Sequence, residues 1–304
     1  MNNQSSFSNL LAKGCKASTV STKHVLKLQA EIEKRRNNSE FGPDFAQEYM
    51  FRFKFAPPEE LPNAQTLIIV AMPRPPTKAT FTWNGKTQSF ILPPTYTAYD
   101  EKRIEVERLV AEAVGEDGYQ VATPILPLKL LAARSGLVEY GRNNITYAEG
   151  MGSFMRLTAV YSDMPCDEDQ WKYTRMMKRC ENCDICRKAC LTGAISKDRF
   201  LLRAERCLTY HNEKKGNIPF PDWIKPSWHN AIVGCLTCQR ACPENKPFLN
   251  QLGETAEFNE EETKLLLHGT PREQVPAETM RKLRILSLTD YYDELPRNLS
   301  VLLK

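Results

Sequence analysis

The sequence predicts an α+β protein that carries a cysteine-rich segment and ends in a short helical segment. Three observations favour this fold class. Residues 66–165 mix strand-like and helix-like hydrophobic patterns, eight of the ten cysteines lie between positions 180 and 242, and residues 248–304 show mainly helical patterns. We therefore expect an α/β domain with a helical N-terminal segment over residues 1–170, a cysteine-rich domain over 171–247, and a C-terminal helical segment over 248–304 that packs on the core.

The elements of the first domain follow from local patterns. The first 65 residues are expected to be mainly helical and irregular, with one amphipathic helix over residues 22–36. The apolar run 66–72 predicts a buried strand, and residues 79–91 predict a hairpin that turns at Asn84-Gly85. Further along the chain we expect helices over 101–115 and 128–135, the second ended by Gly136, and strands over 118–121 and 153–161.

Composition sets bounds on the class of protein. The 304 residues are 41% hydrophobic and carry a net charge of +4, which suits a globular chain and does not by itself indicate a nucleic-acid binder. No apolar run is long enough to span a membrane. Residues 1–11 lack the basic start and apolar stretch of a secretory signal, so we expect a cytoplasmic protein whose thiols stay reduced.

The spacing of the cysteines is the strongest chemical signal. Cysteines 180 to 190 follow the pattern C-x2-C-x2-C-x3-C, which in two-cluster ferredoxins gives three ligands to one iron–sulfur cluster and the fourth to the other. The second run lacks its first member, because Ile232 stands there, and Cys207 is the only cysteine left to complete it. We therefore predict two 4Fe–4S clusters, one held by Cys180, Cys183, Cys186 and Cys242, the other by Cys190, Cys207, Cys235 and Cys238.

Other readings of these residues are weaker. Paired C-x2-C units also build structural zinc sites, although four cysteines within eleven residues suit a cubane cluster better. Cys15 and Cys166 stand apart from the runs and are expected to be small buried hydrophobes. The four histidines are scattered, and no nucleotide-binding glycine motif is present.

The chain resembles the epoxyqueuosine reductase and reductive dehalogenase superfamily. The resemblance lies in residues 131–144 and 152–165, in the eight-cysteine arrangement with its displaced Cys207, and in the Arg-Asn pair of residues 295–299. It extends with gaps from about residue 66 to residue 304, so much of the chain lies outside the cysteine segment. A ferredoxin would need only that segment, and the excess favours an enzyme over an electron carrier.

The resemblance implies a nitroreductase-like α/β domain that binds base-off cobalamin, followed by a ferredoxin-like double-cluster domain. By position, the corrinoid contacts would include Arg134, Gly141, Arg142, Asn143, Tyr147 and Ser153. Ordinary loop and turn chemistry explains these residues about equally well.

The proton donor is where the match departs from the epoxyqueuosine reductases. The resemblance implies that epoxyqueuosine reductases carry an aspartate ahead of the Arg-x-Gly-Leu motif. This chain has Ala122 near that position. Tyr140 and Tyr119 are the best substitutes, since a tyrosine is the donor suggested by reductive dehalogenases. Either tyrosine could instead be a packed aromatic, and for both we slightly prefer that reading.

These inferences lead to one main functional hypothesis and two alternatives. The main one is a cobalamin- and 4Fe–4S-dependent reductase that takes electrons from a low-potential donor such as ferredoxin or flavodoxin and reduces an unidentified small molecule. The first alternative is epoxyqueuosine reduction on tRNA, and the second is a dicluster electron-transfer or corrinoid-handling protein. A dehalogenase is less favoured, because respiratory dehalogenases carry export signals and we expect none in this sequence. Basic residues flanking the first cysteine run are expected to face solvent or an acidic donor.

Overall fold

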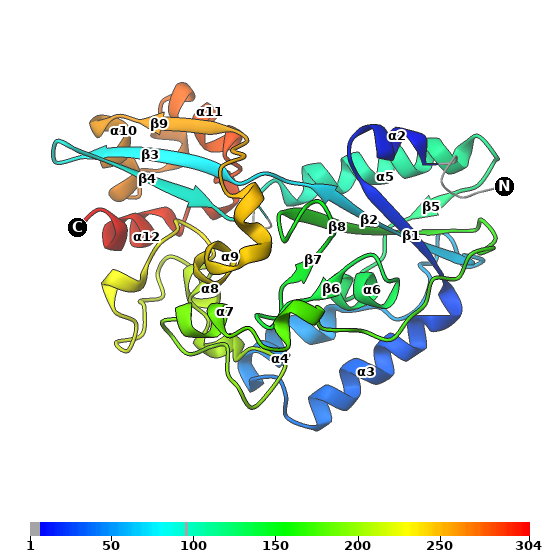
Figure 1. Ribbon diagram of the computed structural model, residues 1–304. Helices are drawn as coiled ribbons and strands as arrows, with labels where there is room; N and C mark the ends of the chain where they lie inside the picture. The colour runs from blue at the N-terminus through cyan, green and yellow to red at the C-terminus, as the bar shows by residue number, and fades with distance from the viewer. Residues whose placement is uncertain (1–6, 95–96) are drawn as a thin grey trace. The chain divides into compact units, whose positions relative to one another are not determined.

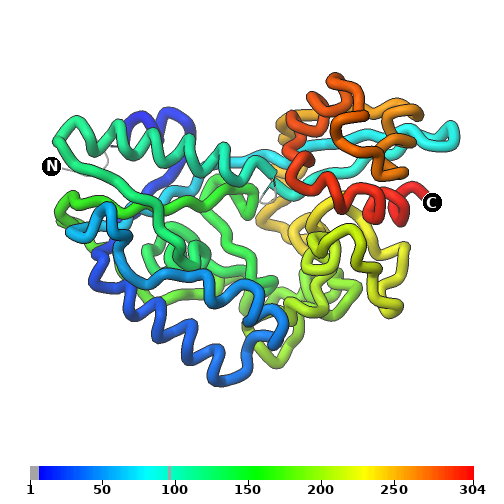
Figure 2. The backbone as a smooth tube through the Cα atoms, turned by 180° about the vertical axis from the view of Figure 1, so that it is seen from behind, coloured from blue at the N-terminus to red at the C-terminus, as the bar shows by residue number. Residues whose placement is uncertain are grey.

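The structure is a computed structural model that describes residues 7–94 and 97–304 (Figures 1 and 2). The prediction made for residues 1–11 therefore lies partly outside the described residues. Contacts divide the chain into two compact units, Met1–Pro73 with Asp100–Asp184, and Arg74–Tyr99 with Ile185–Lys304. No helix in the described ranges is long and apolar enough to cross a membrane.

The first unit is built on a four-stranded antiparallel sheet with the order β1-β2-β8-β5. Its strands are β1 (Lys16–Ser21), β2 (Thr66–Pro73), β8 (Met155–Ser162) and β5 (Val121–Ala122). The two central strands, β2 and β8, are buried along nearly their whole length. Both faces of this sheet are therefore covered, which explains why β2 appears in the sequence as a continuous apolar run.

Helices cover the two faces of this sheet. One face packs Ile68, Val70 and Met72 of β2 against α5 (Tyr99–Gly115) and the short helix α2 (Ser8–Ala12). Figure 1 shows α6 (Leu128–Arg134) on the opposite side of the sheet, where it contacts β2 and β8. The remaining elements of the unit are α3 (Val25–Asn37), α4 (Pro43–Tyr49), the strand pair β6 (Glu139–Tyr140) and β7 (Thr146–Tyr147), and 3-10 turns over Thr22–His24, Met50–Arg52 and Lys178–Cys180.

The predicted elements of this unit are confirmed, with small shifts at their ends, but strand β1 and the two-residue strands β6 and β7 were missed. The structure contains the helices expected over 22–36, 101–115 and 128–135 and the strands expected over 66–72 and 153–161. The strand expected over 118–121 is displaced to Val121–Ala122. Strand β1 was not predicted, because the N-terminal segment was expected to be helical and irregular. As an edge strand of mostly polar residues, β1 leaves little hydrophobic pattern in the sequence.

The second unit contains a three-stranded sheet with the order β4-β3-β9. Strands β3 (Thr77–Trp83) and β4 (Lys86–Leu92) form the predicted hairpin, and both turn residues, Asn84 and Gly85, have positive φ as a type I′ turn requires. Strand β9 (Thr255–Phe258) then pairs in parallel with β3. The C-terminal segment is thus not only helical, and the hairpin belongs to the second unit rather than to the first domain.

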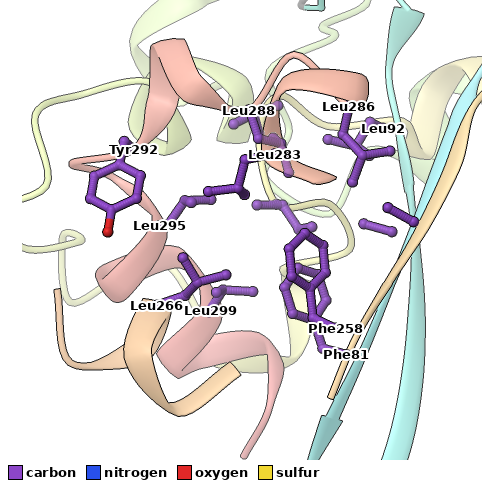
Figure 3. Close-up of a cluster of buried hydrophobic side chains, with 14 of the residues drawn as sticks. Phe81, Leu92, Phe258, Leu266, Leu283, Leu286, Leu288, Tyr292, Leu295 and Leu299 are labelled. Carbon is purple, nitrogen blue, oxygen red and sulfur yellow. The ribbon is translucent and has the colours of Figure 1, made fainter. Parts of the chain in front are cut away.

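A hydrophobic core joins this sheet to three C-terminal helices (Figure 3). Phe81 and Phe258 stack with ring centroids 4.7 Å apart and an interplanar angle of 6°. Against them pack α10 (Glu260–Leu267), α11 (Ala277–Ile285) and α12 (Leu295–Leu302). The helical part of the C-terminal prediction is therefore confirmed, and this core fixes α12 within the second unit.

The cysteine segment has little regular structure. It contains three one-turn helices, α7 (Ile185–Ala189), α8 (Leu208–Asn212) and α9 (Thr237–Ala241), and 3-10 turns over Ala204–Arg206, Pro226–Trp228 and Pro243–Phe248. Two further 3-10 turns, Arg272–Gln274 and Thr289–Tyr291, lie between the C-terminal helices. The contact division falls at Asp184, inside the first cysteine run, and so differs from the boundary expected at residue 171. The three-part division by predicted cofactor stays a prediction.

Candidate functional site

Four of the eight predicted cluster ligands come together in the second unit. Cys190 directly follows α7, Cys207 directly precedes α8, and Cys235 and Cys238 lie at α9, which packs against α7. Burial, together with the neighbouring Cys235 and Cys190, raises the pKa of the Cys207 thiol to about 11. Burial likewise raises the pKa of Cys238, with contributions from all three of the other cysteines and from Cys186. The four thiols therefore lie within electrostatic reach of one another.

The other four predicted ligands lie around the division between the units. Cys180 and Cys183 close a tight turn at the end of the first unit, in which the Cys183 N–H donates to the Cys180 carbonyl at 3.3 Å. Cys186 and Cys242 belong to the second unit, and Cys242 directly follows α9. The grouping of these four cysteines stays a prediction.

No group of three or more His, Cys, Asp or Glu side chains in the described ranges 7–94 and 97–304 is arranged to hold a single metal ion. The ligands of a cubane cluster bind separate iron atoms at its corners, so they stand farther apart than the ligands of one zinc ion. The eight cysteines supply the thiolate donor set that two such clusters need.

Arg142 supports the first cysteine turn. Its Nε donates to the carbonyl of Cys183 at 2.7 Å, and its Nη2 donates to the carbonyls of Glu181, at 3.1 Å, and Cys180. The family resemblance implies a corrinoid contact for Arg142, and that contact stays a prediction. The guanidinium is already engaged by three backbone carbonyls of the segment that carries two predicted cluster ligands.

Three other predicted corrinoid contacts form one tight turn between β6 and β7. The Asn143 side chain donates to the Tyr147 hydroxyl at 3.0 Å, and both side chains are buried. A Cβ atom on Gly141 would lie 2.6 Å from Asn143 Oδ1 and from Tyr147 Cε2, so only glycine fits there. These residues fix the backbone of the turn and turn their side chains inward.

The last two predicted corrinoid contacts are separate from this turn. Ser153 is fully buried before β8. Arg134 pairs with Glu31 and lies 5.5 Å from the centre of the Trp171 ring. The structure therefore does not gather all six predicted residues into one set of exposed donors.

The two candidate proton donors differ in environment. Tyr140 is buried, and burial together with the nearby carboxylate of Glu31 raises the pKa of its phenol, so the hydroxyl keeps its proton at neutral pH. Tyr119 packs partly buried against the core between α5 and the sheet, which fits the reading of a packed aromatic. Ala122 lies in β5 opposite Tyr161 and offers no acidic group.

The Arg-Asn pair of the C-terminal segment has a structural role that the sequence did not reveal. Arg297 donates to four backbone carbonyls, those of His211, Asn212, Lys215 and Ile218, over 2.8–3.2 Å. Asn298 donates to the carbonyls of Asn212, at 3.0 Å, and Ile232, at 2.7 Å. Helix α12 thus ties the segment after Cys207 to the segment before Cys235.

Asn212 completes this network. Its side chain donates to the carbonyls of Gly234, at 2.7 Å, and Ala231, at 3.3 Å. A Cβ atom on Gly216 would lie 1.8 Å from the carbonyl oxygen of Asp293, which shows how closely the 212–218 segment approaches the start of α12. The network explains how a cysteine 28 positions before Cys235 can belong to the same group of thiols.

The two cysteines outside the runs behave differently from each other. Cys15 is buried in the core of the first unit, as predicted, and burial raises the pKa of its thiol to about 11. Cys166 is only partly buried, contrary to the prediction, because it lies in the loop that leaves β8.

Comparison with known proteins supports a double 4Fe–4S cluster domain, while the grouping of the cysteines stays a prediction. The family described as "4Fe-4S double cluster binding domain" matches residues 179–245. Epoxyqueuosine reductases from Burkholderia pseudomallei and Pseudomonas aeruginosa are 34% and 33% identical over 149 and 151 residues, which is 46% and 48% of this chain. The matched regions are only 35% and 40% of those relatives' own length.

The fold comparison covers more of the chain than the sequence comparison. The epoxyqueuosine reductase of Streptococcus thermophilus superposes over 100% of this chain and 81% of its own, with a TM-score of 0.65 and 17% identity. A structure of an epoxyqueuosine reductase with an epoxyqueuosine-modified tRNA-Tyr stem loop covers 99% of this chain with a TM-score of 0.64. The chain is therefore similar to epoxyqueuosine reductases in sequence over just under half of its length and in fold over nearly all of it, and residues 179–245 match the 4Fe-4S double cluster binding domain.

Proposed function

We propose that the chain is an oxidoreductase of the epoxyqueuosine reductase type that uses two 4Fe–4S clusters and a corrinoid. The observation that carries this proposal is the eight-cysteine arrangement within a chain whose fold is that of an epoxyqueuosine reductase. An external low-potential donor, such as a ferredoxin or flavodoxin, would supply the electrons. Such a donor fits residues 185–240, which hold ten Lys and Arg against four Asp and Glu.

The comparisons favour epoxyqueuosine on tRNA as the substrate over the unidentified small molecule of our main hypothesis. The relatives at about one-third identity are named epoxyqueuosine reductases, and a solved structure of this fold holds a modified tRNA stem loop. We therefore place tRNA reduction first and a small-molecule substrate second. The second candidate rests on Ala122, which leaves this chain without a carboxylate where the resemblance predicts the proton donor.

The corrinoid would be held mainly through shape and backbone groups. The turn formed by Gly141, Asn143 and Tyr147 is rigid, because its side chains pack on one another, and a rigid backbone can pair with the amide groups around a corrin ring. We include in this proposal that the first unit, which is a covered antiparallel sheet, has a nitroreductase-like fold. When bound, the corrinoid supplies low-valent cobalt that reduces the substrate.

The proton that the reduction consumes would come from this chain. Tyr140 is our candidate, since its raised pKa keeps the phenol protonated, and Tyr119 ranks second because it packs into the core. The eight cysteines would hold the two clusters in the groups given above, and Arg142 would fix the turn that presents Cys180 and Cys183.

Anaerobic reconstitution with iron and sulfide, followed by loading with cobalamin, tests the cofactor part. We expect about eight iron atoms per chain and one corrinoid, seen by metal analysis and the visible spectrum. Full iron without corrinoid binding would leave the electron-transfer alternative. The substrate part is tested by incubating the loaded, reduced protein with tRNA that carries epoxyqueuosine and measuring queuosine in nucleoside digests. No conversion by a fully loaded protein would reject tRNA as the substrate.

Tyr140→Phe tests the proton donor. Turnover should fall strongly while iron and corrinoid contents stay unchanged. Unchanged turnover in Tyr140→Phe, with a loss in Tyr119→Phe, would transfer the role to Tyr119.

A further inference from the structure

A short tripeptide recurs at three of the predicted ligands of the second cluster. Cys-Leu-Thr occurs at residues 190–192, 207–209 and 235–237, and the other five cysteines of the segment are not followed by it. Each repeat therefore places a threonine two residues after a cysteine that we assign to the same cluster. Two of the tripeptides lead into the short helices α8 and α9, whereas the first follows the end of α7, so a shared position in a helix does not account for all three.

In two of the three repeats the structure places the threonine hydroxyl beside the sulfur of its own cysteine. Thr192 Oγ1 lies 3.6 Å from Cys190 Sγ, and Thr237 Oγ1 lies 3.5 Å from Cys235 Sγ. The third repeat has the same spacing, with Thr209 two residues after Cys207. The repeated spacing thus has a repeated contact.

Asn230 adds a further donor to the Cys235 sulfur. Its Nδ2 lies 3.4 Å from Cys235 Sγ and 3.0 Å from Thr237 Oγ1, and its Oδ1 accepts from the backbone N–H of Leu236 at 3.2 Å. A thiolate bound to iron can only accept hydrogen bonds, so the amide and the threonine hydroxyl must both point their hydrogens at it. The amide can also donate to the hydroxyl that donates to the sulfur, and such chains strengthen each member.

We propose that the three threonines of the Cys-Leu-Thr repeats, with Asn230, donate hydrogen bonds to the ligand sulfurs of the second cluster and set its reduction potential above that of the same cluster without them. The proposal rests on the proposed function in that a 4Fe–4S cluster is held by Cys190, Cys207, Cys235 and Cys238. Reduction adds negative charge to a cluster and its thiolates, so donors to sulfur stabilise the reduced form more than the oxidised form. These four side chains are positioning and tuning residues and supply no ligand.

The experiment compares midpoint potentials in the reconstituted full chain, by redox titration followed by electron paramagnetic resonance. Thr192→Val, Thr209→Val, Thr237→Val and Asn230→Leu should keep the wild-type iron content and shift the midpoint potential of one cluster to more negative values. The triple threonine variant should shift the potential of the second cluster further, and the potential of the first cluster, the one assigned to Cys180, Cys183, Cys186 and Cys242, should stay unchanged. Serine at the same three positions keeps the hydroxyl and should restore the wild-type potential.

The control is Thr80→Val, which removes a buried hydroxyl from β3, a strand without cluster ligands. The proposal is overturned if fully loaded valine variants titrate at the wild-type potential, or if the serine variants shift as much as the valine variants. If the wild-type protein takes up no 4Fe–4S cluster under these conditions, the proposed function fails instead, so the two failures are distinguishable.

Discussion

Replacing Asn298 tests whether helix α12 holds the segments that carry Cys207 and Cys235. The side chain is 1% exposed and donates at 3.0 Å to the carbonyl of Asn212 and at 2.7 Å to that of Ile232. In Asn298→Ala the Asn212 carbonyl keeps its bond from Arg297, at 3.0 Å, so the larger penalty falls on the Ile232 carbonyl. A lost hydrogen bond and one unsatisfied buried acceptor together cost about 2–4 kcal/mol.

Urea unfolding followed by tryptophan fluorescence measures this cost, because Trp223 and Trp228 lie in the region that the network holds. Asn298→Asp keeps the size of the side chain but replaces the donor by an acceptor, so it should destabilise at least as much as alanine. The matched control is Asn250→Ala at an exposed position, which should change the free energy of unfolding by less than about 0.5 kcal/mol.

The same variants report on the second cluster. The network joins the segments that carry Cys207 and Cys235, two predicted ligands of the second cluster. Asn298→Ala should therefore also bind less iron on reconstitution, while Asn250→Ala should not. An Asn298→Asp protein with the unfolding free energy and iron content of the wild type would refute the role that we assign to this network.

Three further predictions concern charged residues. Burial raises the pKa of Glu213 from its usual 4.5 to about 8, so the carboxyl ionises first in the unfolded chain and the free energy of unfolding falls as the pH rises from about 4.5 to 8. Urea titrations at pH 5 and pH 8 should show this fall in the wild type and not in Glu213→Gln. An equal fall in both proteins would contradict the prediction. Burial opposes the charge on Glu262, but hydrogen bonds from Lys282, the Asn259 backbone and Thr279 lower its pKa. Glu262→Gln should therefore destabilise by about 1–3 kcal/mol at pH 7, and the loss should shrink as the pH falls through the lowered pKa and the wild-type carboxyl takes up its proton; a loss that is the same at acid and neutral pH in urea titrations would contradict this. Arg142→Gln should lose the first cluster and keep the second, so that the iron content falls from about eight toward about four atoms per chain. Arg108→Gln, on the exposed face of α5, should not change the iron content. Full iron loading of Arg142→Gln would show that the cysteine turn forms without the guanidinium.

Local patterns predicted the elements that have a strong hydrophobic period or a specific turn. The hairpin was found because Asn84-Gly85 encodes its own turn, and the buried strand 66–73 because both of its faces are covered. Strand β9 was missed for the opposite reason. It is four residues long, and the strand it pairs with, β3, lies more than 170 positions earlier in the chain.

The site was predictable where chemistry fixes residue type and spacing, and less so where packing decides. The cysteine runs fall in the region matched by a double-cluster family, since an iron–sulfur cluster demands thiolates at set intervals. The roles of Arg142 and Arg297 could not be read in advance, because both donate to backbone carbonyls, which every residue type possesses. Only the fold decides which carbonyls they meet.

The parallel pairing of β3 with β9 has a consequence for how the chain matures. During synthesis the hairpin leaves the ribosome long before residues 255–258, so the side of β3 that later receives β9 must wait with its backbone groups unpaired. The first unit, by contrast, needs nothing beyond residue 184 for its internal contacts. We expect nascent chains stalled near residue 250 to be protease-resistant over the first unit and sensitive over residues 74–99.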